Sequence, residues 1–294
     1  MAGQQRLAVV GAGLMGAALA RLFAIAGWAV RVSDPDQQAL DRLEATSTSG
    51  GGGGLSTHRV LAEAVSDADL VIEAAPEKAP LKQNLFVQLA ALTPAHCILA
   101  TNSSVIPVAT VAAQVDDANA QRIIGTHFWN PPELIPLVEV IQGPRSSAAA
   151  IQAALTMLRG VGKYAVHVRR DVVPGNRLQH ALWREAMALV DEGVCTPEDV
   201  DAIIKNSFGL RLAVLGPLEN ADLVGLELTA DIHRVVLPQL SRATEPSPGL
   251  LQRVHSGARG VASGAGFYAS WSADQVAALR TRLVAHVRRL LKER

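Results

Sequence analysis

Short apolar runs alternate with longer segments of helical periodicity up to about residue 172 of this chain. Each run is four or five residues long, which is typical of strands buried on both faces of a parallel sheet. The predicted strands are Arg6 to Val10, Ala29 to Ser33, Leu70 to Glu73, Cys97 to Thr101, Ile123 to His127, Leu137 to Ile141 and Tyr164 to Val168. Because helices separate most of them, the pattern predicts a doubly wound α/β sheet.

The helical pattern continues alone after about Gly175. This change places a domain boundary near Asp171 to Gly175, so we expect a sheet-containing domain at 1–172 and an all-helical domain at 173–294. The clearest predicted helices are Leu14 to Ala26, Asp36 to Ala45, Lys78 to Leu92, Ser147 to Val161 and Ala273 to Leu291. Five consecutive glycines, Gly50 to Gly54, predict a flexible loop from Thr46 to Thr57.

The composition narrows the class of protein. Apolar residues make up 49% of the 294 residues and charged residues 18%, which excludes a disordered chain. Lys plus Arg and Asp plus Glu are 27 each, so there is no net charge to favour nucleic acid or an anionic membrane as a partner. Two cysteines, Cys97 and Cys195, are too few for a disulfide framework and fit a reducing cytoplasm. No histidine or cysteine spacing suggests a metal site, and we expect neither a signal peptide nor a membrane span.

The first predicted strand is followed by Gly11-Ala12-Gly13-Leu14-Met15-Gly16, which matches G-x-G-x-x-G. The pattern is weak alone, but here a strand precedes it and a helix follows. Gly11 permits the tight turn, Gly13 lets the backbone approach a pyrophosphate, and Gly16 lets the helix pack on the sheet. The free N–H groups at the helix start favour the phosphates.

Asp34 ends the second predicted strand, 18 residues beyond Gly16. A carboxylate at this place accepts hydrogen bonds from the adenosine ribose and repels a 2′-phosphate. The sequence therefore favours NAD over NADP as the cofactor. A plain glycine turn with a helix-capping Asp34 is the alternative.

Several further motifs, taken in order, resemble the L-3-hydroxyacyl-CoA dehydrogenase family over nearly the whole chain. They are Glu73-Ala74-Ala75-Pro76-Glu77, Thr101-Asn102-Ser103-Ser104, His127-Phe128-Trp129-Asn130-Pro131, Pro136-Leu137-Val138-Glu139-Val140, Pro174-Gly175-Asn176-Arg177 and Gly264-Ala265-Gly266-Phe267-Tyr268. The resemblance implies a Rossmann-like NAD-binding domain, a helical C-terminal domain that forms a homodimer, and an active site in the cleft between them.

The resemblance also implies roles for individual residues. His127 resembles the catalytic base and Glu139 its orienting carboxylate, while Ser104 and Asn176 resemble residues that hydrogen-bond the substrate oxygens. The expected cofactor-binding residues are Gly11, Gly13, Leu14, Met15, Gly16, Asp34, Glu77, Lys82 and Asn102.

The chemistry of alcohol oxidation agrees with these roles. A base must take the hydroxyl proton while hydride leaves the same carbon, and histidine suits this because its ordinary pKa is near neutral. Glu139, expected on the neighbouring strand, can hold the other ring nitrogen. Ser104, Asn130 or Asn176 can polarise the carbonyl in the reverse direction. Structural roles remain open: Ser104 and Asn176 also fit as caps, and Glu77 as a first-turn helix charge.

Three departures from the best-known members concern the substrate. Gly175 directly precedes Asn176, whereas the family usually has three further residues there. The glycine loop replaces a longer helical hairpin that carries basic residues for CoA, and Ala262 replaces a lysine. The chain looks more like the branch that acts on small free hydroxy acids, which includes L-gulonate 3-dehydrogenase with lambda-crystallin, carnitine dehydrogenases and pyridine-carboxylate dehydrogenases.

The sequence therefore predicts an NAD-dependent oxidoreductase that transfers hydride between NAD and the C3 hydroxyl of a 3-hydroxy acid. Arg211 is a candidate clamp for the substrate carboxylate, although a plain surface arginine fits equally well. Two alternatives remain open. One is the same chemistry on a short 3-hydroxyacyl-CoA such as 3-hydroxybutyryl-CoA, and the other is an NAD-binding structural or regulatory protein with impaired catalysis.

Overall fold

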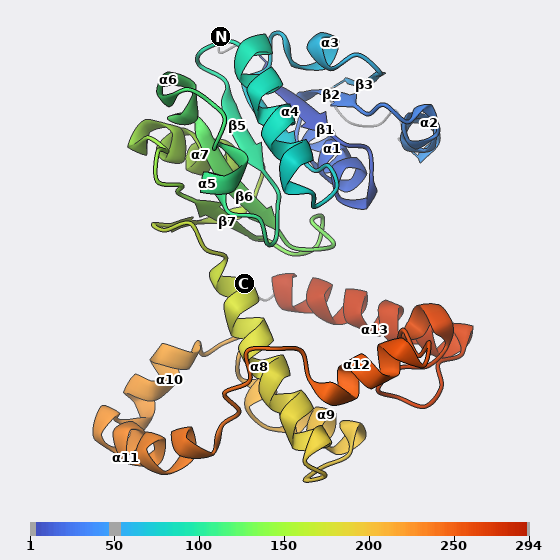
Figure 1. Cartoon of the computed structure of the whole chain (residues 1–294), viewed down its shortest axis with the longest axis vertical. Helices are drawn as coiled ribbons and strands as arrows, with labels where there is room; N and C mark the ends of the chain where they lie inside the picture. The colour runs from blue at the N-terminus through green and yellow to red at the C-terminus, as the bar shows by residue number, and fades with distance from the viewer. Residues whose placement is uncertain (1–3, 47–53, 293–294) are drawn as a thin grey trace. The chain divides into compact units, whose positions relative to one another are not determined.

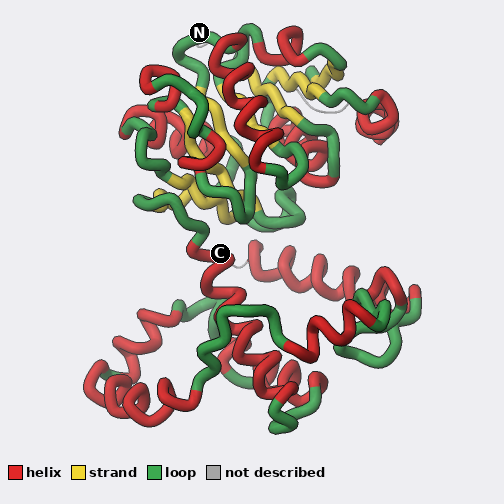
Figure 2. Tube along the Cα trace, in the orientation of Figure 1, coloured by secondary structure: helices red, strands yellow, loops and turns green. Residues whose placement is uncertain are grey.

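The computed structural model describes residues 4–46 and 54–292, which fold into two compact units, Met1–Pro174 and Gly175–Arg294. Unit 1 is a strand-rich layer enclosed by helices, whereas the described part of unit 2 is helical (Figures 1 and 2), apart from one isolated bridge between Gly260 and Ala265. The predicted fold class, an α/β domain followed by an all-helical domain, is confirmed.

Unit 1 contains one eight-stranded sheet with the strand order β3-β2-β1-β4-β5-β6-β7-β8. Only the pairing of β6 with β7 is antiparallel; the other six pairings are parallel. The strands are β1 Arg6–Val10, β2 Ala29–Ser33, β3 Leu55–His58, β4 Leu70–Glu73, β5 Ile98–Thr101, β6 Ile123–Phe128, β7 Leu137–Ile141 and β8 Tyr164–Val168.

Helices cover both faces of this sheet. In unit 1 they are α1 Leu14–Ile25, α2 Gln37–Thr46, α3 Leu61–Val65, α4 Ala79–Leu92, α5 Val108–Val111, α6 Asp117–Ala120 and α7 Ala148–Gly160. The helical segments that follow are α8 Pro174–Asp191, α9 Pro197–Asn206, η1 Phe208–Leu210, α10 Pro217–Val224, α11 Leu226–Val236, η2 Leu237–Gln239, α12 Pro248–His255, η3 Val261–Ser263 and α13 Ala273–Lys292.

The expected loop from Thr46 to Thr57 is wrong at its end, because β3 begins at Leu55 and pairs in parallel with β2. The sequence Leu-Ser-Thr-His has one strongly apolar residue, so it lacks the pattern of a buried strand. It lies at the edge of the sheet, where one side of the strand has no neighbour and burial is incomplete. The glycines Gly50 to Gly53 of that predicted loop lie outside the described residues.

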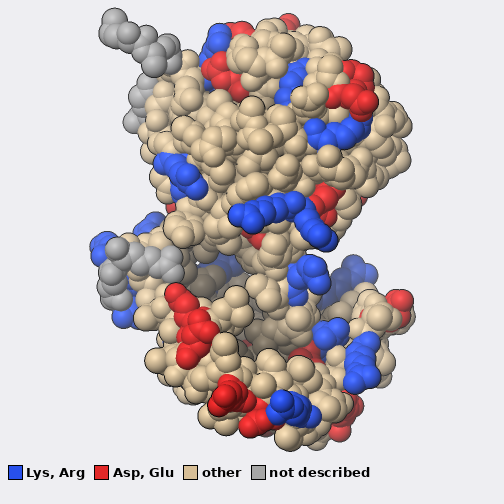
Figure 3. Space-filling model, turned by 90° about the vertical axis from the view of Figure 1, so that its left-hand side faces the viewer, with Lys and Arg blue, Asp and Glu red and all other residues tan. Residues whose placement is uncertain are grey.

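The hydrophobic core of unit 1 forms two layers, because successive residues of a strand face opposite sides of the sheet. In β1, Leu7 and Val9 pack with α1, α2 and α7, whereas Ala8 and Val10 pack with α3, α4 and α5. This double burial explains why the strands appear as continuous apolar runs. On the face drawn in Figure 3, the charged side chains are scattered and both signs are mixed within each unit.

Asp69 ties the amino ends of three strands together. It accepts hydrogen bonds from the Arg6 backbone (2.9 Å), from Nη2 of the Arg6 guanidinium (3.1 Å) and from His96 Nε2 (3.1 Å). Partial burial acts to raise the pKa of Asp69, but the hydrogen bonds outweigh it and hold that pKa below its usual value. The charged carboxylate is thus the form that the fold stabilises.

We expect Asp69→Asn to lower the free energy of unfolding by about 1.5 kcal/mol at neutral pH, measured by urea denaturation. Because the folded pKa is depressed, this contribution is complete above pH ~4 and disappears as the pH falls through the folded pKa. The difference from wild type therefore shrinks in acid. Asp117→Asn is the control, since Asp117 pairs with Arg145 on an exposed surface. An equal effect from both variants would contradict the role given to Asp69.

The two cysteines differ in accessibility. Burial raises the pKa of Cys97 to about 12, and the thiolate is the reactive form. We expect iodoacetamide at pH 8 to alkylate Cys195, which is partly exposed, and to leave Cys97 unmodified until the protein unfolds. Peptide mass spectrometry measures both sites. Modification of Cys97 at the rate of Cys195 in the folded protein would contradict this expectation.

Candidate active site

The turn between β1 and α1 has the geometry of a phosphate cradle. Gly11 has φ +106°, and a Cβ on Gly16 would lie 1.8 Å from the Gly11 carbonyl oxygen, so both positions require glycine. A Cβ on Gly13 would meet no atom within 4 Å, because Gly13 faces open space. With Met15, Gly11 and Gly13 line a pocket of about 840 Å³, while Leu14, the first residue of α1, is exposed beside it.

Asp34 lies in the same pocket at the carboxyl end of β2. Its Oδ2 accepts the N–H of Ala12 (2.7 Å), and its Oδ1 accepts the N–H of Asp36 (2.9 Å). The carboxylate is therefore held rigidly beside the glycine turn. A side-chain-free cradle next to a fixed acid fits a dinucleotide, with phosphates at the turn and a ribose at Asp34.

Two arginines that sequence reasoning did not assign to the cofactor, Arg42 and Arg59, also line this pocket. Arg42 forms an ion pair with Asp36 at 3.6 Å. Neither belongs to a sequence motif, and only the fold brings α2 and the segment after β3 to the same opening. The signal available in the sequence was their position as the first two arginines after Asp34.

A buried charged network joins the carboxyl ends of β4 and β5. Glu73 is 0% exposed and Lys82 1% exposed, and Lys82 Nζ donates to Glu73 Oε1 at 2.6 Å. The other oxygen of Glu73 accepts the Thr101 hydroxyl (2.8 Å). Lys82 also donates to the carbonyl of Ala75 (3.1 Å), which lines the dinucleotide pocket. Sequence reasoning singled out Lys82 but missed Glu73 as its partner, although the two are only nine residues apart.

Glu77 organises the next loop of the same pocket. Its Oε2 accepts the Ser103 hydroxyl (2.8 Å), and its Oε1 accepts the N–H of Ser104 (2.9 Å). Lys82 Nζ lies 3.7 Å from Glu77. Glu77, Lys82 and Ser104, predicted separately from the sequence, are thus brought together at the carboxyl edge of the sheet.

His127 and Glu139 lie directly opposite each other on β6 and β7. His127 Nδ1 and Glu139 Oε2 are 2.7 Å apart, and the two residues are 4% and 3% exposed. Trp129 packs edge-on against the imidazole, with ring centroids 5.5 Å apart. A buried imidazole held by a carboxylate is the arrangement required of a general base.

Asn102 connects this pair to the dinucleotide pocket. Its side-chain oxygen accepts the N–H of Phe128, the residue after His127, at 3.1 Å, and Asn102 itself lines the pocket. Asn130 follows β6 in the segment that leads to β7. Unit 1 therefore gathers ten of the predicted site residues at one edge of the sheet: Gly11, Gly13, Gly16, Asp34, Glu77, Lys82, Asn102, Ser104, His127 and Glu139.

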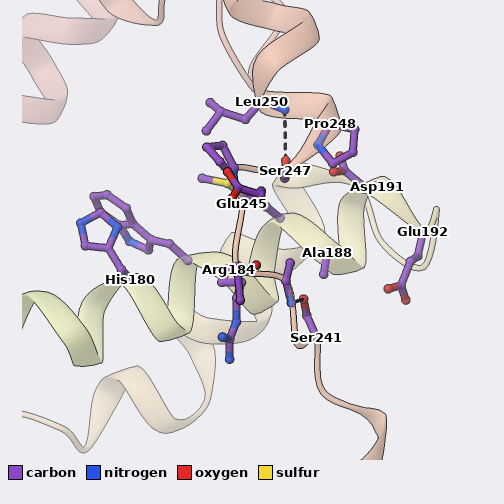
Figure 4. A pocket seen from close by; sticks show the side chains of 15 residues that line it. His180, Arg184, Ala188, Asp191, Glu192, Ser241, Glu245, Ser247, Pro248 and Leu250 are labelled. Atoms are coloured by element: carbon purple, nitrogen blue, oxygen red, sulfur yellow. Dashed lines mark hydrogen bonds between the residues drawn. The ribbon is translucent and has the colours of Figure 1, made fainter.

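Two predicted site residues, Asn176 and Arg211, belong to unit 2. Asn176 lies in the first turn of α8, where Pro174 starts the helix, and Arg211 is exposed in the turn after η1. Unit 2 also has a pocket of about 910 Å³ between α8 and the segment 241–250, and His180 and Arg184 of α8 lie along it (Figure 4). Its lining includes neither Asn176 nor Arg211.

Within residues 4–46 and 54–292, no three His, Cys, Asp or Glu side chains are grouped as metal ligands. In the same described part of the chain, no helix is both long enough and apolar enough to span a bilayer.

Comparison with protein families matches both units. Residues 6–53 and 51–172 match the NAD binding domain of 3-hydroxyacyl-CoA dehydrogenase, and residues 174–270 match the C-terminal domain of the same family. The 5-formyl-3-hydroxy-2-methylpyridine 4-carboxylate 5-dehydrogenase of Mesorhizobium japonicum is 31% identical over 310 aligned positions, covering 99% of each chain. The L-carnitine dehydrogenase of Streptomyces griseus is 38% identical over 268, covering 81% of this chain and 79% of that enzyme.

Among solved structures, the chain is similar to a 5-formyl-3-hydroxy-2-methylpyridine 4-carboxylic acid 5-dehydrogenase described as an NAD⁺-dependent dismutase. The TM-score is 0.91 at 29% identity, and the match covers 99% of this chain and 100% of that one. Family, relatives and pocket agree on NAD as the cofactor. This chain therefore belongs to the 3-hydroxyacyl-CoA dehydrogenase family and is an NAD-dependent dehydrogenase that acts on a CH–OH group.

Proposed function

We propose that this enzyme oxidises the C3 hydroxyl of a small free hydroxy acid, with His127 as the catalytic base. The proposal rests on the buried pairing of His127 with Glu139. The next residue, Phe128, donates its backbone N–H to the side chain of Asn102. The strand that carries His127, β6, pairs with β5, and Asn102 at the end of β5 lines the dinucleotide pocket. Bound NAD supplies the hydride acceptor.

The tautomer of His127 follows from its neighbour. A carboxylate only accepts hydrogen bonds, so Nδ1 carries the ring proton and donates a hydrogen bond to Glu139. Nε2 then has a free lone pair and can take the proton of the substrate hydroxyl as the C–H bond gives up its hydride and a C=O bond forms. The resulting imidazolium is stabilised by Glu139, which lies in the same buried environment.

Other polar side chains are proposed to orient the oxygen that reacts. Ser104 is positioned through its backbone by Glu77, and Asn130 follows β6, so both are suited to donate a hydrogen bond to the substrate oxygen. Asn176 of unit 2 is proposed to make a similar contact. Glu77 and Lys82 are proposed to hold the nicotinamide side of the cofactor, and Asp34 the adenosine ribose.

The proposed substrate class is a free acid rather than a CoA thioester. Two relatives are named for carnitine and for a pyridine carboxylate, and the chain lacks both the basic hairpin and the late lysine expected of enzymes that bind CoA. Arg211 is the proposed partner of the substrate carboxylate, since guanidinium binds carboxylate in a bidentate manner.

Turnover of paired substrates tests this choice. NADH formation is measured at 340 nm with 3-hydroxybutyrate, L-carnitine and 3-hydroxybutyryl-CoA. We expect a higher kcat/KM for a free acid than for the thioester, and a preference for the thioester would overturn the proposed substrate class. NAD binding without hydride transfer to any of them would favour a structural or regulatory role.

We further propose that unit 2 forms a homodimer. Among its described residues, Val200 is the single buried hydrophobic one, whereas α11 alone exposes Leu226, Leu228, Ile232, Val235 and Val236. A helical unit with so little core gains stability by covering these faces with a second copy. Light scattering after size exclusion should give about twice the 31.0 kDa chain mass, and a monomer at micromolar concentration would contradict the proposal.

A cytoplasmic location is proposed on the basis of the two unpaired cysteines, Cys97 and Cys195. The balanced charge further supports small molecules, rather than nucleic acid or a membrane, as partners. Cell fractionation followed by immunoblotting tests the location, and recovery of the enzyme outside the cytoplasmic fraction would contradict it.

A further inference from the structure

Lys163 is a buried cation that the proposed mechanism does not use. The residue is 7% exposed and lies between α7 and β8. Its Nζ donates to the carbonyl of Ile135 at 3.1 Å and to the carbonyl of Pro132. No carboxylate forms an ion pair with Lys163 in the described part of the chain, so two backbone carbonyls hold the ammonium group.

Both carbonyls belong to the segment of residues 129–136, which joins β6 to β7. Here we call it the β6–β7 segment. It forms a single turn in which the N–H groups of Leu134 and Ile135 donate to the carbonyl of Pro131 at 3.1 and 3.0 Å. The ammonium group lies at the carbonyl end of this turn, where a positive charge is favourable. The backbone next to Lys163 supports the same segment, because Tyr164 N–H donates to the Pro136 carbonyl at 2.9 Å.

The β6–β7 segment begins beside the proposed base. Trp129 packs against the His127 imidazole, Asn130 comes next, and β7 brings Glu139 back opposite His127. Any shift of the turn would therefore move Trp129 and Asn130 relative to the imidazole. The dinucleotide pocket is lined by other elements and includes no residue of this segment.

Burying the ammonium group of Lys163 lowers the stability of the fold, so stability by itself does not favour a charged residue at this position. Burial lowers the pKa of Lys163, with Glu133 on the same segment acting in the opposite direction, so the environment penalises the charged form. An apolar side chain of similar length would fill the volume without that cost. What such a side chain would lose is the pair of hydrogen bonds to the Pro132 and Ile135 carbonyls.

We propose that Lys163 is a positioning residue that holds the β6–β7 segment so that Trp129 and Asn130 present a preformed surface to the substrate. The inference rests on the proposed function of His127 and its surroundings. It assigns Lys163 no contact with substrate, cofactor or reacting atoms.

Lys163→Met tests the proposal because methionine keeps the length and removes the donor. We expect KM for the hydroxy-acid substrate to rise about tenfold, since small misplacement of substrate-contacting groups is costly. The Kd for NAD, measured by fluorescence titration, should stay within about twofold, because the segment does not line that pocket. Hydrogen exchange by mass spectrometry should show faster exchange of the Leu134 and Ile135 amides.

Lys205→Met is the matched control, since Lys205 is an exposed lysine of α9 paired with Asp201. It should leave all three measurements unchanged. Should Lys163→Met fail to fold, Lys163→Gln retains an N–H donor without the charge and should give an intermediate KM. Unchanged KM and exchange in the Lys163 variants would overturn the inference, as would a parallel loss of NAD affinity, which indicates a general structural role.

The two proposals fail in different ways. Full turnover in His127→Ala would refute the proposed function. If Lys163→Met still showed faster exchange of the β6–β7 segment, the role of Lys163 in holding that segment would stand. Unaltered exchange with a dead His127→Ala variant would refute only the role of Lys163.

Discussion

His127→Ala is expected to lower kcat by about 10²–10⁴-fold, the usual contribution of a positioned general base. The imidazole is removed, and Glu139 remains on the neighbouring strand with nothing to orient. The Kd for NAD should change little, because His127 is not among the residues that line the dinucleotide pocket. Stopped-flow measurement of NADH formation at saturating NAD gives the chemical step.

His167→Ala is the appropriate control. His167 lies on β8 of the same sheet and is exposed. Among the described residues, its side chain hydrogen-bonds only the side chain of Gln142 (3.1 Å). It should retain wild-type turnover. Wild-type kcat in His127→Ala would remove His127 from the mechanism, and an equal loss in both variants would indicate damage to the sheet rather than to the base.

Glu73→Gln is expected to lower the free energy of unfolding of unit 1 by about 3 kcal/mol, because the buried Lys82 then keeps only the more distant, partly exposed Glu77 as a counter-charge. The pair is almost completely buried, so water cannot replace the lost carboxylate. The Ala75 amide and the Thr101 hydroxyl lose a charged acceptor as well. NAD affinity should also fall, since Ala75 lines the dinucleotide pocket. Urea denaturation and fluorescence titration measure the two effects.

The double variant Glu73→Gln with Lys82→Met separates charge from shape. Removing both charges should recover most of the lost stability, because an apolar side chain replaces the unpaired ammonium. NAD affinity should recover less, since Lys82 is a proposed neighbour of the cofactor. If the double variant were as unstable as the sum of the two single variants, the energetic coupling inferred from the 2.6 Å contact would be wrong.

The sequence predicted most of unit 1 because its strands are buried on both faces and its turns need particular residues. Apolar runs such as Leu70 to Glu73 differ clearly from the helical periodicity around them. Position 16 requires glycine, because any side chain there would clash with the Gly11 carbonyl. The edge strand β3 and the short helix α3 were not predicted, since each is short and only partly buried. Local pattern is weakest where burial is incomplete.

The site was predicted unevenly for a related reason. Asp34 lies at a fixed distance along the chain from the glycine turn, so a motif includes it. Glu73 and Lys163 belong to no spacing rule, and their importance comes from what lies around them after folding. In the folded protein, Glu73 is buried beside Lys82 and balances its charge. Lys163 is buried beside the Pro132 and Ile135 carbonyls and donates hydrogen bonds to them.

By itself, the amino-acid order determined the α/β class, the nucleotide turn with its acid, and the identity of the proposed base. The nucleotide turn and its acid depend on one strand, one turn and the next strand, so their spacing along the chain reveals them. The base, His127, was identified because its motif resembles that of a known family. The tertiary structure alone decided that β7 runs antiparallel to β6 and so sets Glu139 opposite His127. It also decided which charges are buried together, because burial and pairing depend on segments distant in sequence that meet only when the sheet closes.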